Sequence, residues 1–408
     1  MPSVCFYFQV HQPFRVKRYP IFNIGSDHEY FNDDSESKLN NKKIFQKVAE
    51  KCYIPANRIL LESLRAHPEF RVSFSLSGVF LEQAELYAPE VLNSFYQLAK
   101  TGQVEFLSET YHHSLAALYS FEEFKKQVLM HRDIVQKFFG VRPRVFRNTE
   151  LIYNNEIAGW AEQLGFEGIL AEGVDNVLGW RSPNFVYTAK NTETIKVLLK
   201  NYRLSDDVAF RFSSREWAEW PLDAKKFATW ITEHNGGGEV INLFMDYETF
   251  GEHQWESTGI FNFLRSLPRE VLEASPDNNF KTPSEVCTTY PTKGTFDVDR
   301  HISWADVERD LSAWRSNAMQ HTALDAVYAL ERDVCASGDT QLIEDWRRMQ
   351  TSDHFYYMCT KWFADGDVHK YFNPYESPYD AFISYMNALN DLKIRIAQKV
   401  VLPHHTMV

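Results

Sequence analysis

The stretch VINLFMDYETFGEH, residues 240–253, joins two features that rarely occur in one segment. A largely apolar run from Val240 to Met245 leads directly into Asp246 and Glu248. Such a run is typical of a strand that is buried on both faces of a parallel sheet. Carboxylates at the end of a buried strand cost free energy unless they are paired or used. The segment therefore predicts either a strand that surfaces into a polar loop or a strand that delivers acidic groups to a site.

Six other segments in the first 250 residues have the same form, a short apolar run followed by polar residues. Helical patterns separate several of them, and two of these patterns end in a glycine, Gly140 and Gly165, at positions typical of a helix stop. Alternating strands and helices predict a mostly parallel sheet, and seven such units favour a closed β/α barrel one unit short of eight. An open doubly wound sheet is the alternative. The other six predicted strands lie at 3–12, 71–78, 103–113, 143–151, 166–174 and 194–207, and the helical patterns at 54–67, 121–140 and 154–165.

The chain changes character near residue 300, where apolar residues begin to recur at helical spacing. We therefore predict an α/β fold with two parts, a (β/α)7 barrel at 1–290 and a C-terminal helical region at 291–408. The stretch 264–300, rich in Pro, Ser, Thr and Asn, is the expected connection. Trp304 is expected to open the first C-terminal helix, whereas Trp314, Trp346 and Trp362 are expected to pack in the core.

Composition excludes several classes of function. The net charge of −12 argues against nucleic acid and against anionic membranes as partners. No stretch approaches the ~18 consecutive apolar residues of a membrane span, and the N-terminus lacks the basic segment of a signal peptide. The five cysteines have no CxxC spacing, which indicates reduced thiols, a cytoplasmic location and no cysteine-based metal site.

Polar residues gather at the expected carboxyl-terminal ends of five strands, where the active site of a β/α barrel lies. Alternation along a strand predicts that Glu109 and His113 share one face, and likewise Asp246 and Glu248. An acidic, aromatic mouth suits glycoside hydrolysis, which needs one carboxylic acid and one carboxylate. GxSxG, Walker and GxGxxG motifs are absent. The polar residues are His11, Glu109 to His113, Glu150, Asp206, Asp207, Asp246 and Glu248.

Five blocks in order resemble glycoside hydrolase family 57, in particular its shorter α-amylase-like members. The resemblance implies a sevenfold barrel followed by helices, and a retaining mechanism on α-1,4-glucans or maltooligosaccharides with no metal or other cofactor. It places the nucleophile at Glu150 and the general acid/base at Asp246. Some transferase-type members have Glu-Pro where this chain has His113 and Ser114, which leaves open how far transglycosylation accompanies hydrolysis. The blocks are HQP at 11–13, GQVEFLSETYHHS at 102–114, FRNTELIYNN at 146–155, FMDYETFGEH at 244–253 and MQTSDHFYYM at 349–358.

Further residues are assigned to substrate binding. His11 and His113 are expected to hydrogen-bond sugar hydroxyls, and Glu248 to support Asp246 or contact the substrate. Trp304 is the candidate sugar platform of the C-terminal region. Asp353 and His354 interrupt an aromatic run inside the fifth block and are expected to line the cleft.

Three alternatives stay open at this stage. Glu150 could be a structural carboxylate paired with Arg144 or Arg147. The protein could bind glucans without cleaving them. A metal-dependent polysaccharide deacetylase, with histidines such as His11 and His113 as ligands, is a third option, although the first strand ends in VHQP and lacks the aspartate pair expected there.

Overall fold

Seven parallel strands form a closed ring in the computed structural model, which describes residues 2–35, 38–361 and 368–401. Parallel pairing runs from β8 through β1 and β2 to β3, and from β4 through β5 and β7 back to β8. A parallel bridge between Ser108 and Phe146 joins β3 to β4 and completes the ring. The predicted (β/α)7 barrel is therefore confirmed, and the open sheet is excluded. The strands are β1 (Ser3–Val10), β2 (Val72–Leu76), β3 (Val104–Phe106), β4 (Val145–Phe146), β5 (Gly168–Glu172), β7 (Lys196–Lys200) and β8 (Val240–Asp246).

Both faces of each long barrel strand are buried, which explains the continuous apolar runs. In β1, Phe6 and Phe8 point outward and pack in the layer formed with the surrounding helices. Cys5 and Tyr7 belong to a separate cluster with Phe244 and other inward residues of β4, β5, β7 and β8. The register places Gln9 beside Asp246, so the inward face of two neighbouring strands turns polar at the same end.

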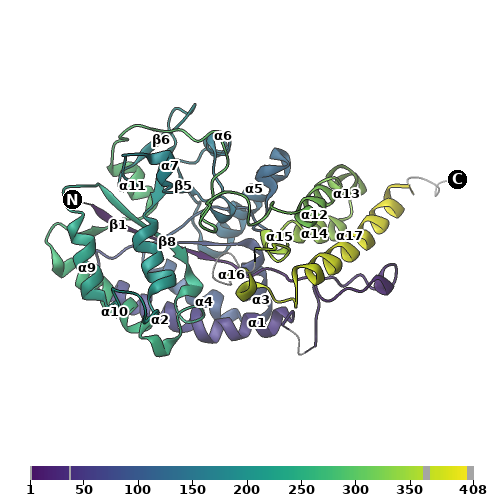
Figure 1. The fold of residues 1–408 in the computed structure, drawn as a ribbon, viewed down its shortest axis with the longest axis horizontal. Coiled ribbons are helices and arrows are strands. Elements are labelled where there is room, and N and C mark those ends of the chain that lie inside the picture. Colours follow the sequence, from purple (N-terminus) through teal and green to yellow (C-terminus); the bar gives the residue numbers. More distant parts are fainter. Residues whose placement is uncertain (1, 36–37, 362–367, 402–408) are drawn as a thin grey trace.

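Helices between the strands cover the outside of the barrel (Figure 1). The three predicted helices are confirmed as α2, α5 and α6, and Gly140 ends α5 with a φ of 71°. A φ in this left-handed region suits glycine, which has no Cβ to clash. The helices of the barrel are α1 (Asn41–Val48), α2 (Ile54–Ala66), α3 (Gly78–Tyr87), α4 (Pro89–Ala99), α5 (Phe121–Phe139), α6 (Asn155–Gln163), α7 (Asp175–Leu178), α8 (Tyr202–Asp206), α9 (Ala224–Glu233), α10 (Ile260–Ala274) and α11 (Pro283–Thr289).

Two predictions about this part of the chain are wrong. The strand predicted at 194–207 ends at Lys200, because the Asn201 side chain accepts a hydrogen bond from the Leu204 amide and starts α8. The expected connection at 264–300 instead belongs to the fold: β9 (Asn279–Phe280) pairs with β1, and β10 (Thr295–Phe296) pairs with β6 (Tyr187–Ala189). Its turn-forming residues act as caps, such as Thr282 in the capping box of α11.

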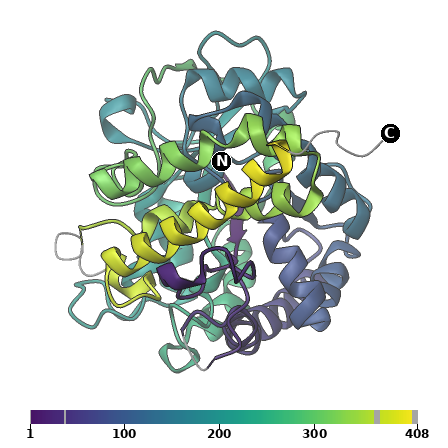
Figure 2. The ribbon, with the colours of Figure 1, turned by 90° about the vertical axis from the view of Figure 1, so that its right-hand side faces the viewer.

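The C-terminal helices gather at the end of the barrel toward which β1 runs (Figure 1). Figure 2 looks onto this end, where α17 and the helices near it lie across the barrel. Ser114, after β3, forms an antiparallel bridge with Thr351, which ties the two parts together. Trp314 and Trp346 are buried as predicted, whereas Trp362 lies outside the described residues. The helices are α12 (Ala318–Tyr328), α13 (Glu331–Ser337), α14 (Thr340–Arg348), α15 (Ser352–Tyr356), α16 (Val368–Phe372) and α17 (Pro378–Val401).

The segment before α12, residues 301–317, does not form the predicted helix. Ile302 pairs with Tyr153 in an antiparallel bridge, so this part of the segment is extended. Asp306 and Arg309 have φ values of 53° and 51°, which a right-handed helix does not accept. Trp304 therefore lies in an irregular loop over the barrel and does not open a helix.

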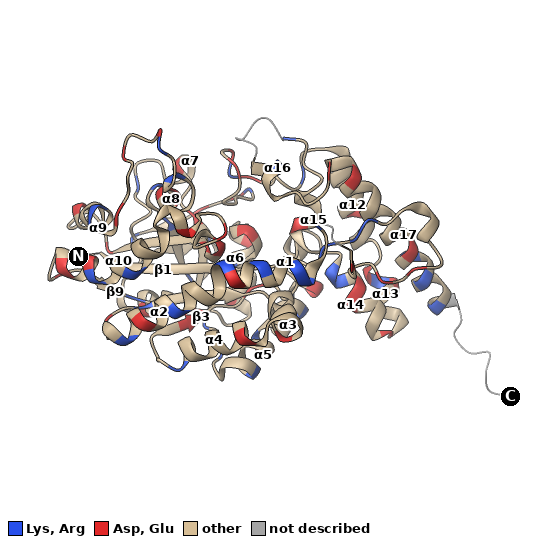
Figure 3. Cartoon of the chain, turned by 90° about the horizontal axis from the view of Figure 1, so that it is seen from below, with Lys and Arg blue, Asp and Glu red and all other residues tan. Residues whose placement is uncertain are grey.

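No helix among the described residues has the length and apolarity that crossing a bilayer requires. Acidic and basic residues are interspersed over both the barrel and the C-terminal helices (Figure 3). The net negative charge is thus spread over the chain.

Candidate active site

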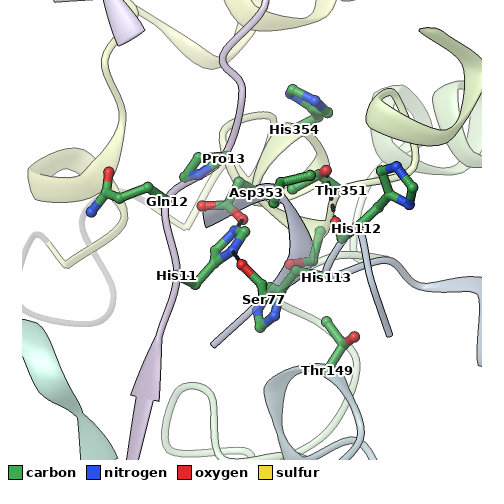
Figure 4. Close-up of polar contacts among 12 residues, drawn as sticks. His11, Gln12, Pro13, Ser77, His112, His113, Thr149, Thr351, Asp353 and His354 are labelled. Carbon is green, nitrogen blue, oxygen red and sulfur yellow. Dashed lines mark hydrogen bonds and ion pairs between the residues drawn. The ribbon is translucent and has the colours of Figure 1, made fainter. Parts of the chain in front are cut away.

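The carboxyl-terminal ends of the strands meet the segment that contains Asp353. Figure 4 shows His11 after β1, Ser77 after β2 and His113 after β3 converging on this point. Thr149, after β4, lies next to the same group. This convergence is the one expected for the active end of a β/α barrel.

Glu150 is held by two N–H donors, one on each carboxylate oxygen. Its Oε1 lies 3.0 Å from Nε2 of His113, and its Oε2 accepts a hydrogen bond of 2.7 Å from Nε1 of Trp304. The Ser352 hydroxyl is 3.4 Å from Oε1. The side chain still keeps 22% of its surface exposed, so the carboxylate is fixed but not sealed.

The ion-pair alternative for Glu150 does not hold. Arg144 binds Glu167 through two hydrogen bonds, of 2.7 and 2.6 Å, at the surface. The guanidinium of Arg147 makes no hydrogen bond within the described part of the chain. Neither arginine therefore occupies the Glu150 carboxylate.

Turns, and not strands, aim the side chains of this site. β3 and β4 end at Phe106 and Phe146, several residues before His113 and Glu150. His113 and Glu150 have φ values of 51° and 58°, in the left-handed region that costs a non-glycine residue roughly 1–3 kcal/mol. The prediction that strand alternation sets the faces of Glu109 and His113 is therefore wrong, although the two side chains do meet.

Asp246 differs from Glu150 in its surroundings. Its carboxylate accepts no hydrogen bond from the described residues, whereas Glu150 has its N–H donors. Burial and the nearby charge of Glu150 raise the pKa of Asp246 to about 6. Burial also acts on Glu150, but the hydrogen bond and charge of His113, with help from Arg147 and Trp304, bring the pKa of Glu150 below its ordinary value. The two groups thus favour opposite ionisation states between these pKa values.

His113 connects Glu150 to a second, fully buried carboxylate, Glu109. Its Nδ1 lies 2.8 Å from Oε2 of Glu109, and Gln9 donates a hydrogen bond of 3.0 Å to Oε1 of the same group. Burial opposes the charge on the imidazole, yet the two carboxylates raise the pKa of His113 to about 9. Burial likewise opposes the charge on Glu109, yet His113 lowers its pKa to about 2. His113 is therefore an imidazolium that donates to both carboxylates.

His11 stacks on His113 with 4.0 Å between ring centroids. Its Nδ1 lies 2.7 Å from the Ser77 hydroxyl, and its Nε2 lies 3.0 Å from Oδ2 of Asp353 (Figure 4). Burial and the charge of His113 lower the pKa of His11, while His11 and His113 lower that of Asp353 against its own burial. All ring nitrogens of both histidines are thus engaged by protein groups.

Two other predicted binding residues, Glu248 and His354, are buried beside the site. Glu248 accepts a hydrogen bond from the Tyr53 hydroxyl, and burial together with the Asp246 charge raises the pKa of Glu248 to about 8. His354 is buried against the C-terminal helices, with Nε2 3.0 Å from the Arg348 carbonyl, and burial lowers its pKa to about 4. Glu248 therefore adjoins the site, whereas the His354 ring packs behind Asp353.

The strand ends also hold charged residues that sequence reasoning missed. Lys200, the last residue of β7, lies 3.0 Å from Asp206, and Arg309 lies 3.0 Å from Glu172 at the end of β5. Lys200 and Arg147 both face the Trp304 ring, at 5.4 and 4.8 Å from its centroid. Glu172 and Lys200 could have been predicted as site residues, because each is a charged residue at the end of an apolar run. Asp207, the neighbour of Asp206, instead pairs with Arg211 at 2.7 Å.

The histidines do not converge as metal ligands. His112 points to Glu344, with 3.1 Å between Nε2 and the carboxylate, while His11 and His113 bind the groups described above. In the described ranges, no three His, Cys, Asp or Glu side chains are grouped so that they could hold a metal ion.

Comparison with known proteins connects this geometry to one family. The sequence model described as "Glycosyl hydrolase family 57" matches residues 5–299. A protein of Methanocaldococcus jannaschii described as "Putative alpha-amylase" is 43% identical over 406 residues, which cover 97% of this chain and 85% of that protein. The crystal structure of a family 57 branching enzyme from Thermococcus kodakaraensis superposes with a TM-score of 0.70 at 15% identity, covering 98% of this chain and 90% of that one. A family 57-type branching enzyme from Pyrococcus horikoshii superposes with a TM-score of 0.67 at 15% identity, covering 100% and 98%.

Proposed function

The chain belongs to glycosyl hydrolase family 57, and from that premise we propose that it cleaves α-1,4-glucans with retention of the anomeric configuration. The substrate class follows the relative described as "Putative alpha-amylase", which matches nearly the whole chain. The observation that carries the mechanism is the contrast between two carboxyl groups. Glu150 is hydrogen-bonded and held ionised, whereas Asp246 has a pKa raised to about 6 by burial and by the Glu150 charge.

In the first step, Glu150 attacks the anomeric carbon while Asp246 protonates the leaving glycosidic oxygen. The glycosidic C–O bond breaks and an ester bond to Glu150 forms, which gives a covalent glycosyl-enzyme intermediate. Asp246 suits the acid role because a carboxyl group with a raised pKa stays protonated closer to neutral pH. Loss of the Glu150 charge in the intermediate then removes one cause of the raised pKa of Asp246, so Asp246 stays ionised, which is the form that accepts a proton in the second step.

In the second step, Asp246 takes a proton from water, and the oxygen of this water displaces Glu150 from the anomeric carbon. A sugar hydroxyl in place of water would give a transfer product by the same chemistry. Hydrolysis and transglycosylation therefore share both carboxylates and differ only in the acceptor.

We assign sugar contact to the partly exposed residues of the predicted set. Trp304 presents an indole that already donates to Glu150, and Asp353 keeps 22% of its side chain exposed. His11 and His113 have their ring nitrogens occupied, so they would meet sugar hydroxyls only after releasing a protein partner. Glu248 and His354 are buried and support the cleft from behind.

We also propose that the C-terminal region, residues 291–408, completes the site of the barrel and is not a detachable module. Asp353 binds His11, and Ser352 lies beside Glu150, so the region supplies groups at the centre of the site. One buried cluster contains both Phe146 of the barrel and Trp346 of α14. A chain that ends near residue 300 should be insoluble or inactive, and normal glucan cleavage by such a chain would contradict this division of labour.

A cytoplasmic location fits this proposal. The five cysteines form no disulfide in the structure, and four of them are buried. Reduced thiols are usual in a reducing compartment. Fractionation of cells that produce the protein, with detection by antibody, tests the location directly.

Incubation of the purified protein with maltooligosaccharides tests the function. Proton NMR of the first products should show the α-anomer before mutarotation, together with shorter oligosaccharides and, where transfer occurs, longer ones. Binding of maltooligosaccharides without cleavage would favour the non-catalytic alternative. Acetate release from an acetylated oligosaccharide, abolished by a chelator, would favour the deacetylase.

A further inference from the structure

The inside of the barrel contains a charged group whose side chain makes no hydrogen bond to any described residue, the guanidinium of Arg147. The residue is fully buried, and Nε, Nη1 and Nη2 each lack a hydrogen-bond partner within the described residues. Its backbone is fixed, because the Arg147 amide donates a hydrogen bond of 2.8 Å to the Ser108 carbonyl. An unpaired buried cation costs several kcal/mol. A buried cation with this free-energy cost is expected to have a compensating role.

The surroundings of Arg147 lead to the two candidate catalytic carboxylates. Its guanidinium lies 4.8 Å from the centroid of the Trp304 ring. The same indole donates a hydrogen bond of 2.7 Å from Nε1 to Glu150. Its positive charge also favours the ionised forms of Glu150 and Asp246 and so lowers their pKa values. Because the guanidinium nitrogens are inaccessible, no sugar can touch them. Arg147 can act only through its neighbours.

We propose that Arg147 is a positioning residue, a fixed buried cation that seats the Trp304 indole on Glu150 and biases the charge state of the Glu150–Asp246 pair. The inference rests on the proposed function for the roles of the two carboxylates. Arginine suits the task because a guanidinium stays charged at all relevant pH values, is weakly hydrated and stacks on aromatic faces. The other titratable or charged groups around the pair are Tyr7 on β1, Glu109 and His113 after β3, Lys200 on β7, Glu248 after β8 and Tyr356 on α15.

A structural role and a positioning role predict different behaviour for Arg147→Met. Replacing Arg147 by an apolar side chain of similar length removes the desolvation cost of the cation and also removes its attraction to the two carboxylates, and these two effects on stability oppose each other. The thermal midpoint of Arg147→Met should therefore change little. Loss of the cation makes ionisation of both carboxylates harder, so both limbs of the kcat/KM–pH profile should move to higher pH, by roughly one unit.

Arg132→Met provides a matched control. Arg132 is also a buried arginine over an aromatic ring, 4.5 Å from the centroid of Phe166, but it lies on α5 and is not among the charges that act on Glu150 or Asp246. Its replacement should leave both limbs in place. Arg147→Lys restores a positive charge and should return the limbs toward their original positions.

Carbon-13 NMR titration of the Asp246 carboxyl group, assigned with Asp246→Asn, separates this inference from the proposed function. The titration needs no turnover, so it reports on Arg147 even in a protein that cleaves no glucan. An upward shift of the Asp246 titration in Arg147→Met supports the inference. Unchanged titration and unchanged pH limbs, or a lower thermal midpoint with unchanged limbs, would overturn it. Should Arg147→Met not fold, Arg147→Gln is the second neutral variant for the same measurements.

Discussion

His113 and Glu150 are joined through Nε2 and Oε1 at 3.0 Å, and both residues have left-handed backbone, with φ values of 51° and 58°. They belong to turns that follow neighbouring strands, β3 and β4. Each turn therefore contains one residue in a strained backbone conformation, and this conformation brings the His113 and Glu150 side chains into contact. Such strained residues are common at functional sites. The arrangement fixes one carboxylate in position and leaves Asp246 without a hydrogen bond from the described residues.

Replacing Glu150 by alanine should reduce cleavage of maltooligosaccharides to background, because no group remains to form the glycosyl-enzyme ester. Azide should restore part of the cleavage by entering the vacated space, and the product should be the β-glycosyl azide. Product NMR and initial rates measure both effects. Glu239→Gln, which alters a carboxylate paired with Lys293 before β8, is the control and should keep normal activity. Near-normal activity of Glu150→Ala would remove Glu150 as nucleophile.

Asp246 should set the alkaline limb of the activity profile. Its pKa is raised to about 6, so the protonated form needed in the first step is lost as the pH rises through that value. Asp246→Asn should lose roughly 10²–10⁴-fold in rate on maltooligosaccharides and lose this limb as well. On a glycosyl fluoride, whose leaving group needs little protonation, the loss should be far smaller. Asp207→Asn is the control, and equal losses on both substrates would contradict the acid role.

Glu109→Gln should destabilise the protein in a pH-dependent way. His113 has a pKa raised from 6.5 to about 9, so its contribution is full below 6.5 and is lost as the pH rises through about 9. Glu109 has a pKa lowered from 4.5 to about 2, so its contribution is full above 4.5 and is lost as the pH falls through about 2. Both contributions are therefore complete between pH 4.5 and 6.5.

Urea unfolding measures this effect. Within that window Glu109→Gln should lower the free energy of unfolding by about 3 kcal/mol, the usual cost of breaking a buried pair, and by less above pH 9. Glu123→Gln breaks a buried carboxylate pair with Arg347, at 2.8 Å, and serves as control. Since arginine stays charged, the loss of unfolding free energy caused by Glu123→Gln should not become smaller over the same alkaline range. A constant loss for Glu109→Gln would argue against a charged His113.

Trp304→Phe tests the hydrogen bond to Glu150 while it keeps an aromatic ring in the loop. A hydrogen bond to a charged group contributes about 1.5–3 kcal/mol, so kcat should fall roughly 10- to 100-fold. Trp314→Phe is the matched control, because Trp314 is a buried tryptophan of the same segment whose indole is not among the described donors to Glu150. Losses of the same size in both variants would show a general packing effect.

The outline of the fold could be predicted from local patterns. Seven apolar runs gave seven barrel strands because strands buried on both faces need continuous apolar sequence. The positions of α2 and α5 in the chain followed from apolar periodicity, and the end of α5 followed from Gly140. The prediction of a helix around Trp304 is wrong because Asp306 and Arg309 have positive φ values. The spacing of apolar residues carries no information about such backbone conformations.

The sequence by itself determined the seven barrel strands, several of the helices between them and the residue types that reach the active end of the barrel, since these depend on patterns within a few residues. Only the tertiary structure decided which of those residues act on one another. His11 meets Asp353 across 342 positions of the chain, and Trp304 meets Glu150 across 154. The ionisation contrast between Glu150 and Asp246 arises from such contacts, because burial and neighbouring charges set a pKa and neither is a property of the local sequence.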